Sequence, residues 1–376
     1  MKVAIYAICR NEAAFAARFA AASRDADVIV VADTGSTDGC QEALRANGVQ
    51  VHQIQVSPWR FDDARNAALS LVPADIDVCL SLDLDEIVAP GWRPVLETGW
   101  VPGTTRAFYS FVASHLPDGR DGIVFQNTRM HSRHGYRWRH ACHEGLYPDR
   151  IEERFVSLPD IRVDHWPDES KSRSGYIELL KVAVTEEPHE PRMAHYYARE
   201  LYFYARHAEA IDEFKRYLAM GDPSLIGERA ASMLYIARCL DALDRRDEGL
   251  VWRWRAVAEC PAMREPWRDL AEALYIAQDW PGCFGAARKA LSISQPFPGY
   301  MSDPLAWGYS PDDLAAIAAS NLGLKGPALE HAKRALEFEP QDERLRRNVE
   351  VIAAELAQAE APAATKRKAA KQSPTR

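Results

Sequence analysis

The sequence predicts a two-part protein, with an α/β, Rossmann-like domain built on a mixed sheet followed by an all-α domain of helical repeats. Short apolar runs alternate with helix-forming segments up to residue 88, and alternating, aromatic-rich runs follow up to residue 166. Beyond residue 170 strand signals nearly vanish and helical pairs recur. We therefore expect domains at residues 1–168 and 169–358, with a terminal tail at 359–376.

Composition indicates a soluble globular protein. The 376 residues are 47% hydrophobic and 27% charged, and no apolar run approaches the roughly 20 residues of a membrane span. The seven cysteines are odd in number and include no Cys-x-x-Cys pair, which is typical of reduced thiols. These features predict a cytoplasmic protein without a transmembrane segment.

Charge is distributed unevenly along the chain. The net charge is −8, although residues 361–376 carry five basic residues and no acid. The acidic body argues against nucleic acid as the main partner. The tail has the composition of a disordered segment, and it is expected either to aid solubility or to contact an anionic membrane surface weakly.

Polar residues follow three apolar runs of the first domain. We expect strands at residues 3–8, 27–32, 49–56 and 77–82, separated by helices at 13–22, 41–46 and 61–71. The first strand is followed by Arg10, Asn11 and Glu12, the second by Asp33, and the fourth by an acidic cluster at Asp83. In open α/β sheets ligands bind outside the carboxyl ends of the strands, so these residues predict one ligand site.

The acidic cluster consists of Asp83, Asp85 and Glu86. Adjacent carboxylates repel one another unless a cation or a set of donors compensates them. If the strand stays extended, Asp83 and Asp85 lie on one side and Glu86 turns away, which suits two oxygens offered to one divalent ion. The alternative is a solvated turn or a helix N-cap.

The region from residue 105 to 166 is expected to add hairpins to the sheet. Runs at 107–112 and 122–125 flank an Asp118-Gly119 turn signal, and a further strand is expected at 161–163. Four histidines fall between residues 131 and 143, among Arg129, Arg133, Arg137 and Arg139. They raise the alternative of a zinc site built from His140, Cys142 and His143, although ligands this close in sequence rarely complete a tetrahedral site.

Helical pairs beyond residue 170 share one pattern. Taking Ala210, Gly249, Cys283 and Ala328 as equivalent gives spacings of 39, 34 and 45 residues. A period of about 34 residues is the signature of tetratricopeptide (TPR) repeats, and the long last interval contains an insertion at 295–311 rich in Pro, Gly and aromatic residues. The alternative is an irregular helical bundle. A repeat domain either binds a protein partner or buttresses its neighbour.

The first 170 residues or so resemble the family 2 glycosyltransferases, which have the GT-A fold. The matching segments are 8–12, 30–39, 64–68 and 82–86, in the family's order and spacing. Members with TPR repeats behind the catalytic domain are similar also at His143-Glu144 and at residues 164–166. The chain departs from many relatives at Thr34, where they have a second Asp.

The resemblance implies a hexosyltransferase that moves a sugar from a UDP-linked donor to a glycan, lipopolysaccharide or protein acceptor, with inversion. It places the donor on Ile8, Arg10, Asn11, Glu12, Asp33, Arg65, Asn66 and Asp83. It implies a Mn²⁺ or Mg²⁺ ion on Asp83, Asp85 and His165, with Glu144 or else His143 as general base. A divalent ion would stabilise the charge that grows on the departing diphosphate.

Two other classes remain open. One is a nonenzymatic protein-interaction scaffold in which the repeats are the working part and the sheet domain is a relic of a transferase. The other is a nucleotidyltransferase, which is expected to carry a Gly-rich, basic loop after the first strand, whereas residues 7–12 contain no glycine.

Overall fold

The computed structural model describes residues 1–116, 119–168, 175–298 and 301–360. The chain divides into two compact units, Met1–Met220 and Gly221–Arg376. The predicted tail from residue 361, the Asp118 half of the predicted turn and the start of the predicted repeat domain at residues 169–174 lie outside the described residues. The predicted domain boundary at residue 168 stays a prediction.

The first unit opens with four parallel strands, as the alternation of apolar runs and helices predicts. They are β1 (Val3–Cys9), β2 (Val28–Asp33), β3 (Gln50–Gln53) and β4 (Val78–Ser81). Between them lie α1 (Ala13–Ser23), α2 (Cys40–Ala46) and α3 (Phe61–Leu71). All seven residues of β1 are buried, because both faces of this central strand are covered, and such strands read as continuous apolar runs.

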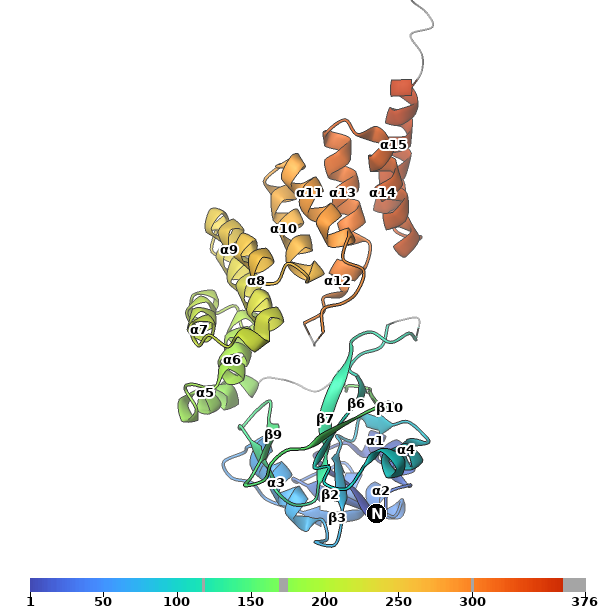
Figure 1. Cartoon of the computed structure of the whole chain (residues 1–376), viewed down its shortest axis with the longest axis vertical. Helices are drawn as coiled ribbons and strands as arrows, with labels where there is room; N and C mark the ends of the chain where they lie inside the picture. The colour runs from blue at the N-terminus through green and yellow to red at the C-terminus, as the bar shows by residue number, and fades with distance from the viewer. Residues whose placement is uncertain (117–118, 169–174, 299–300, 361–376) are drawn as a thin grey trace, which may run out of the picture. The chain divides into compact units, whose positions relative to one another are not determined.

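Later strands turn the sheet into a mixed one (Figure 1). After β5 (Glu86–Val88) and α4 (Trp92–Gly99) come β6 (Arg106–Val112), β7 (Val124–Ser132) and β10 (Phe155–His165), and the eight-stranded order is β3-β2-β1-β4-β7-β6-β10-β5. The predicted hairpin is the antiparallel β6–β7 pair. A separate two-stranded sheet joins β8 (Tyr136–Arg139) to β9 (Gly145–Pro148).

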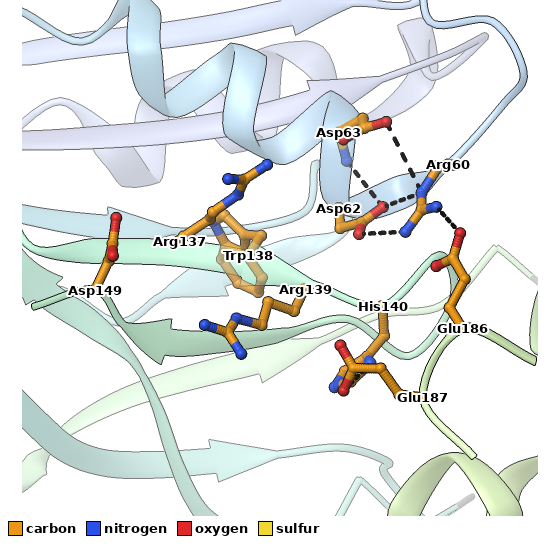
Figure 2. A pocket seen from close by; sticks show the side chains of 10 residues that line it. All are labelled: Arg60, Asp62, Asp63, Arg137, Trp138, Arg139, His140, Asp149, Glu186 and Glu187. Atoms are coloured by element: carbon orange, nitrogen blue, oxygen red, sulfur yellow. Dashed lines mark hydrogen bonds and ion pairs between the residues drawn. The ribbon is translucent and has the colours of Figure 1, made fainter. Parts of the chain in front are cut away.

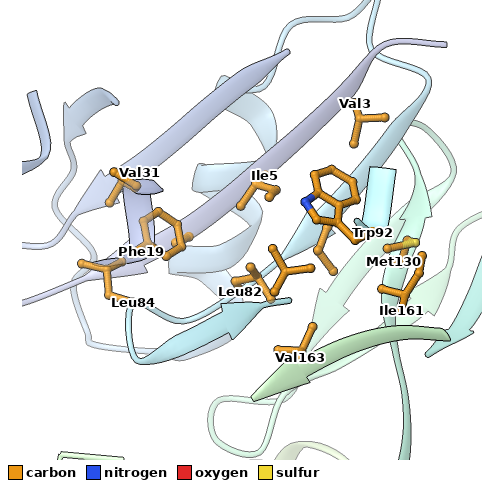
Figure 3. Packing of buried hydrophobic residues seen from close by; sticks show 14 of the residues in the cluster. Val3, Ile5, Phe19, Val31, Leu82, Leu84, Trp92, Met130, Ile161 and Val163 are labelled. Carbon is orange, nitrogen blue, oxygen red and sulfur yellow. The ribbon is translucent and has the colours of Figure 1, made fainter. Parts of the chain in front are cut away.

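Alternate residues of β1 supply two hydrophobic clusters. Val3, Ile5 and Ala7 belong to one cluster with Phe19 and Trp92 (Figure 3), and Ala4, Tyr6 and Ile8 belong to another with helix α3. Successive side chains of a strand point to opposite faces, so each face has its own core. The ends of the parallel strands are thereby held rigidly, and they position the polar residues that follow.

All regular secondary structure in the described chain beyond residue 175 is helical. The first unit contains α5 (Tyr176–Glu186), α6 (Pro191–Phe203) and α7 (His207–Ala219). The second contains η1 (Pro223–Leu225), α8 (Ile226–Ala242), α9 (Arg246–Glu259), α10 (Arg264–Ile276), α11 (Trp280–Leu291), α12 (Pro304–Trp307), α13 (Ser310–Asn321), α14 (Lys325–Phe338) and α15 (Glu343–Glu360). In the part of the chain that is described, no helix is both long and apolar enough to cross a membrane.

Consecutive helices pair as TPR-like repeats. The four positions taken as equivalent lie on α7, α9, α11 and α14, the second helix of each pair, and all four are buried. Small residues there let two helices approach closely. At Gly249 a Cβ atom would lie 3.1 Å from the Ala237 carbonyl oxygen of α8 and 2.7 Å from the Asp241 carboxylate.

Gly249→Ala is expected to destabilise the second unit by roughly 1 kcal/mol, because overpacking outweighs the gain in helix propensity. Gly285→Ala is the matched control: Gly285 is exposed on α11, and its added Cβ would meet no atom within 4 Å. We expect this control to stabilise by about 0.5–1 kcal/mol. Urea unfolding of both variants measures these changes in the free energy of unfolding. Changes of the same sign for the two variants would contradict close packing at Gly249.

Candidate functional site

The chain turns sharply after β4, at the acidic cluster. The Glu86 backbone N–H donates to the Asp83 carbonyl (3.0 Å), and the Asp83 N–H donates to the Glu86 carboxylate (3.0 Å). The strand therefore does not continue in extended form through residues 83–86. The alternation of side chains predicted for these residues is wrong. Asp83 and Glu86 face the same arginine, Arg129, while Asp85 faces His165.

A buried arginine, Arg65, and a half-buried one, Arg129, compensate the acids. Arg65 of α3 donates to Asp83 Oδ1 at 2.8 Å, and Arg129 of β7 lies 3.3 Å from Asp83 Oδ2 and 3.1 Å from Glu86 Oε1. Burial acts to raise the pKa of Asp83, but Arg65 and Arg129 outweigh it and hold that pKa well below its usual range. Burial raises the pKa of Glu86 to about 7, against the opposing charge of Arg129. The guanidinium groups of Arg65 and Arg129 thus place positive charge beside the acids for which a metal ion was predicted.

The third predicted metal ligand also lies at this cluster. His165 pairs with Glu86 in the β10–β5 register, and its Nε2 atom lies 3.5 Å from Asp85 Oδ2. Burial acts to lower the pKa of His165, but the neighbouring Asp85 outweighs it and the pKa is raised. His165 and Asp85 are thus neighbours, but Asp83, Asp85 and His165 are not among the groups of described residues whose ligand atoms all lie within 4.8 Å of one another. Their role as metal ligands stays a prediction.

The two predicted catalytic residues have different surroundings. Glu144 accepts a hydrogen bond from Arg65 Nε, so Arg65 links it to Asp83. His143 adopts a left-handed backbone (φ 53°), and its ring stacks on Tyr196 of α6 with 4.1 Å between centroids. Arg65 therefore connects Glu144 to the acidic cluster, whereas His143 packs against helix α6.

Three of the predicted donor residues bind neighbouring backbone. Asp33 is fully buried, and its Oδ1 atom accepts from the N–H groups of Gly35 and Ser36 at 2.9 Å. Asn11 Oδ1 accepts from the Thr37 N–H, and Asn66 exchanges two hydrogen bonds with the Trp138 backbone. These contacts fix the loops after β1 and β2 and attach β8 to α3. Of the others, Ile8 and Glu12 are buried and Arg10 is exposed; a nucleotide role for all these residues stays a prediction.

The alternative zinc site does not assemble in the part of the chain that is described. The His/Cys/Asp/Glu groups there with ligand atoms within 4.8 Å of one another contain neither Cys142 nor His143. His131, the first histidine of the run, is a core residue. Its Nδ1–H donates to the Ser132 carbonyl, and its Nε2 accepts from Tyr6 Oη, which itself accepts from Trp138 Nε1.

Acid is expected to destabilise the sheet through His131. Burial lowers the pKa of His131 to about 3. As the pH falls below about 6.5, His131 therefore binds a proton in the unfolded chain but stays neutral in the folded chain. This histidine's stabilising contribution is complete above pH 6.5 and falls by about 1.4 kcal/mol per pH unit as the pH is lowered toward 3.

Unfolding free energies measured by urea from pH 7 to pH 4.5 test this prediction. His131→Gln should remove that share of the slope, whereas His52→Gln, a change at an exposed position, should leave it intact. Equal slopes for the natural chain and His131→Gln would contradict it.

The second unit contains a surface that was not predicted from the sequence. The segment between α11 and α13, which we call the strap (residues 292–298 and 301–309), packs along α8 and α10. A Cβ atom on Gly227 of α8 would lie 2.9 Å from the Phe297 ring, and Phe297 and Met301 pack on a buried cluster that includes Ala230 and Met263. The richness of 295–311 in Pro, Gly and aromatic residues marked an insertion but not where it docks.

Polar contacts fix the other end of the strap. Glu265 Oε1 accepts from Trp307 Nε1 at 2.7 Å and from the Asp303 N–H at 3.2 Å. The Arg264 guanidinium lies 4.0 Å from the Trp307 ring centroid, and Arg238 lies 3.7 Å from the Asp303 carboxylate. The surface of α8 and α10 therefore holds one acidic and two aromatic side chains of the strap, whose Asp303 and Trp307 lie at the two ends of the short helix α12.

Comparison with known proteins adds information on the fold of the repeats. No family model and no curated protein matches the chain. Matching solved structures include MamA (17% identity, 45% of this chain and 89% of that one, TM-score 0.37) and YrrB, a TPR protein with an unusual peptide-binding site (15%, 46% and 80%, 0.35). Another is part of a TPR repeat-containing protein from Cytophaga hutchinsonii (14%, 50% and 68%, 0.39). At these identities the likeness concerns the fold alone.

These comparisons contradict the predicted activity. The structures named above are TPR-repeat proteins, and none of them is a glycosyltransferase. The assignment of the chain as an enzyme, a family 2 hexosyltransferase, is therefore corrected. The acids at Asp83 and Asp85, which spoke for the enzyme in sequence, have arginine and histidine partners within the fold.

Proposed function

We propose that this chain is a protein-interaction scaffold whose helical repeats bind a short segment of a partner protein on the surface formed by α8 and α10. The observation that carries the proposal is the strap. A segment with an aromatic anchor at the end of the short helix α12 is already seated there, held by Arg238 of α8 and by Arg264 and Glu265 of α10. A partner segment of the same chemistry, with an acid four residues before an aromatic residue, would meet the same groups.

The chemistry of this surface suits peptide recognition. Arginine and tryptophan dominate binding hot spots, and a guanidinium stacked on an indole ring combines cation–π attraction with apolar burial. Arg264 also donates to the carbonyl oxygen of Ile293 at 2.6 Å, so the surface recognises backbone as well as side chains. The strap and a partner would compete for it, which makes the strap an internal regulator of binding.

The same proposal assigns the GT-A fold to the sheet domain and treats that domain as a relic that supports the repeats. Its ion pairs between Asp83, Arg65 and Glu144 give the retained acids a structural role. A cytoplasmic location belongs to the proposal as well, because none of the seven cysteines, all of them among the described residues, forms a disulfide.

A labelled peptide with the sequence of residues 292–309 tests the proposal. Asp303→Ala/Trp307→Ala weakens the strap in the full chain, and we expect this variant to bind the peptide at least tenfold more tightly than the natural chain. The reason is that a tethered strap competes at an effective concentration in the mM range. Fluorescence anisotropy measures both affinities.

Two control variants distinguish binding at this site from nonspecific binding of the peptide. Leu305 belongs to the same strap but is 45% exposed, so Leu305→Ala should leave peptide affinity at the natural level. Adding Arg264→Ala to the weakened-strap variant should lower the affinity at least tenfold. A folded weakened-strap variant that binds no peptide would overturn the proposal.

A further inference from the structure

Three clusters among the described residues have the ligand types and spacing for a metal ion. In the first, Cys9, Asp33 and Cys40, the hydrogen bond with Cys40 and burial raise the pKa of the Cys9 thiol, and the carboxylate already accepts hydrogen bonds from Gly35 and Ser36. Cys9 and Asp33 are therefore already engaged by neighbours within the fold.

In the second cluster an arginine already supplies the positive charge. Arg162 forms ion pairs with Asp121 at 2.7 Å and with Asp164 at 2.6 Å, and His115 lies beside them. This cluster therefore has the same ligand types as a metal site without the uncompensated negative charge.

The third cluster, His140, Glu187 and Glu190, differs from both. It joins the β8–β9 connection to the connection between α5 and α6, and His140 and Glu187 line a cleft of about 410 Å³ (Figure 2). In that cleft Arg60 forms ion pairs with Asp62 and Glu186 at 2.9 and 2.6 Å, whereas Glu187 has His140 as its ion-pair neighbour, at 3.9 Å.

His140 is prepared as a ligand. Only 4% of the residue is exposed, and its Nε2 atom is 2.9 Å from Tyr147 Oη. A proton on Nε2, donated to Tyr147, leaves a lone pair on Nδ1, which forms no hydrogen bond among the described residues. Metal-bound histidines usually donate their second ring nitrogen in this way.

The Glu187 carboxylate can reach an ion bound by His140, and a ligand atom of Glu190 lies within 4.8 Å of the other two ligand atoms. Two ligands each about 2.0–2.2 Å from a zinc ion are at most about 4.4 Å apart. His140 Nδ1 and Glu187 Oε2, at 3.9 Å, satisfy this limit. One Glu190 oxygen accepts from the Arg192 N–H at the start of α6, which orients the carboxylate and leaves its second oxygen available.

We propose that His140, Glu187 and Glu190 bind one divalent transition-metal ion of the Zn²⁺ class, with water completing the coordination. The ion ties the β8–β9 connection to the start of α6 within the first unit. One nitrogen and two carboxylate ligands suit Zn²⁺ better than Mg²⁺, which prefers an all-oxygen shell.

Calorimetric titration of Zn²⁺ into the full, chelator-dialysed chain tests the site. The natural chain should bind one equivalent, Mg²⁺ should bind at least tenfold more weakly, and Zn²⁺ should raise the thermal midpoint. Both His140→Ala and Glu187→Gln should weaken Zn²⁺ binding at least tenfold and abolish the thermal shift. Glu187 is exposed, so its variant is expected to fold normally.

Matched variants make the result specific. Tyr147→Phe removes only the hydrogen bond behind His140 and should weaken binding about tenfold. His115→Ala, in the arginine-compensated cluster, should leave affinity and stoichiometry unchanged. No Zn²⁺ binding by the natural chain, or full affinity in both His140→Ala and Glu187→Gln, would overturn the proposal.

Discussion

Arg65→Met is expected to lower the unfolding free energy of the first unit by about 3–5 kcal/mol, the usual consequence of removing one partner from a buried ion pair. Arg65 is 5% exposed, pairs with Asp83 and Glu144, and lies 5.1 Å from the Trp138 ring centroid. Burial alone would lower the pKa of Arg65, but the two carboxylates outweigh it and raise that pKa. Its loss leaves both acids without their shared partner in a buried site.

Urea unfolding measured by circular dichroism checks this value. Arg10→Met, at an exposed position after β1, is the matched control and should change stability by no more than about 0.5 kcal/mol. Glu144→Gln added to Arg65→Met should restore part of the loss, because Glu144 pairs with Arg65 whereas Asp83 keeps Arg129. A loss below 1 kcal/mol for Arg65→Met would contradict a structural role for the acidic cluster.

Asp269→Ala is expected to destabilise the second unit by a similar amount, about 3–5 kcal/mol. Asp269 is 2% exposed and joins Arg238 of α8 (2.6 Å) to Arg253 of α9 (2.7 Å), so one carboxylate connects three helices. Burial acts to raise the pKa of Asp269, but the two arginines outweigh it and hold that pKa below its usual range. Its removal takes away the buried carboxylate that the two arginines share, and leaves Arg238 with Asp303 and Arg253 with Asp241.

An exposed ion pair supplies the comparison. Arg245 and Glu248 lie 2.7 Å apart on the surface near the start of α9, and Glu248→Gln should change stability by less than about 1 kcal/mol. Thermal and urea unfolding of the two variants measure the difference. Equal effects for Asp269→Ala and Glu248→Gln would contradict the view that the buried network holds the repeats together.

Much of the fold could be predicted from local pattern. Residues 61–71 form a helix with the predicted ends, and β1, β2 and β4 lie within a residue or so of their predicted limits. The reason is that a buried parallel strand imposes a continuous apolar run on the sequence. The small residues at Ala210 and Ala328 could likewise be aligned, because close helix packing restricts side-chain size wherever it recurs.

Interactions between distant residues could not be predicted in the same way. Asp83 is paired with Arg129 from a strand 46 residues away, and the turn at Glu86 brings both acids to that arginine. Without this information a compensating metal ion was an equally valid reading of the acids. The docking of Trp307 on Arg264 and Glu265 depends on how the insertion folds back, which its composition does not encode.

The position of bound peptide is the most direct test of the central claim, that α8 and α10 form a protein-binding surface. Residue-resolved NMR shifts of the Asp303→Ala/Trp307→Ala chain should be recorded while the 292–309 peptide is added. We expect the perturbed amides to cluster around Gly227, Arg238, Arg264 and Glu265. Shifts confined to the sheet domain, or no shifts in the folded chain, would contradict the account.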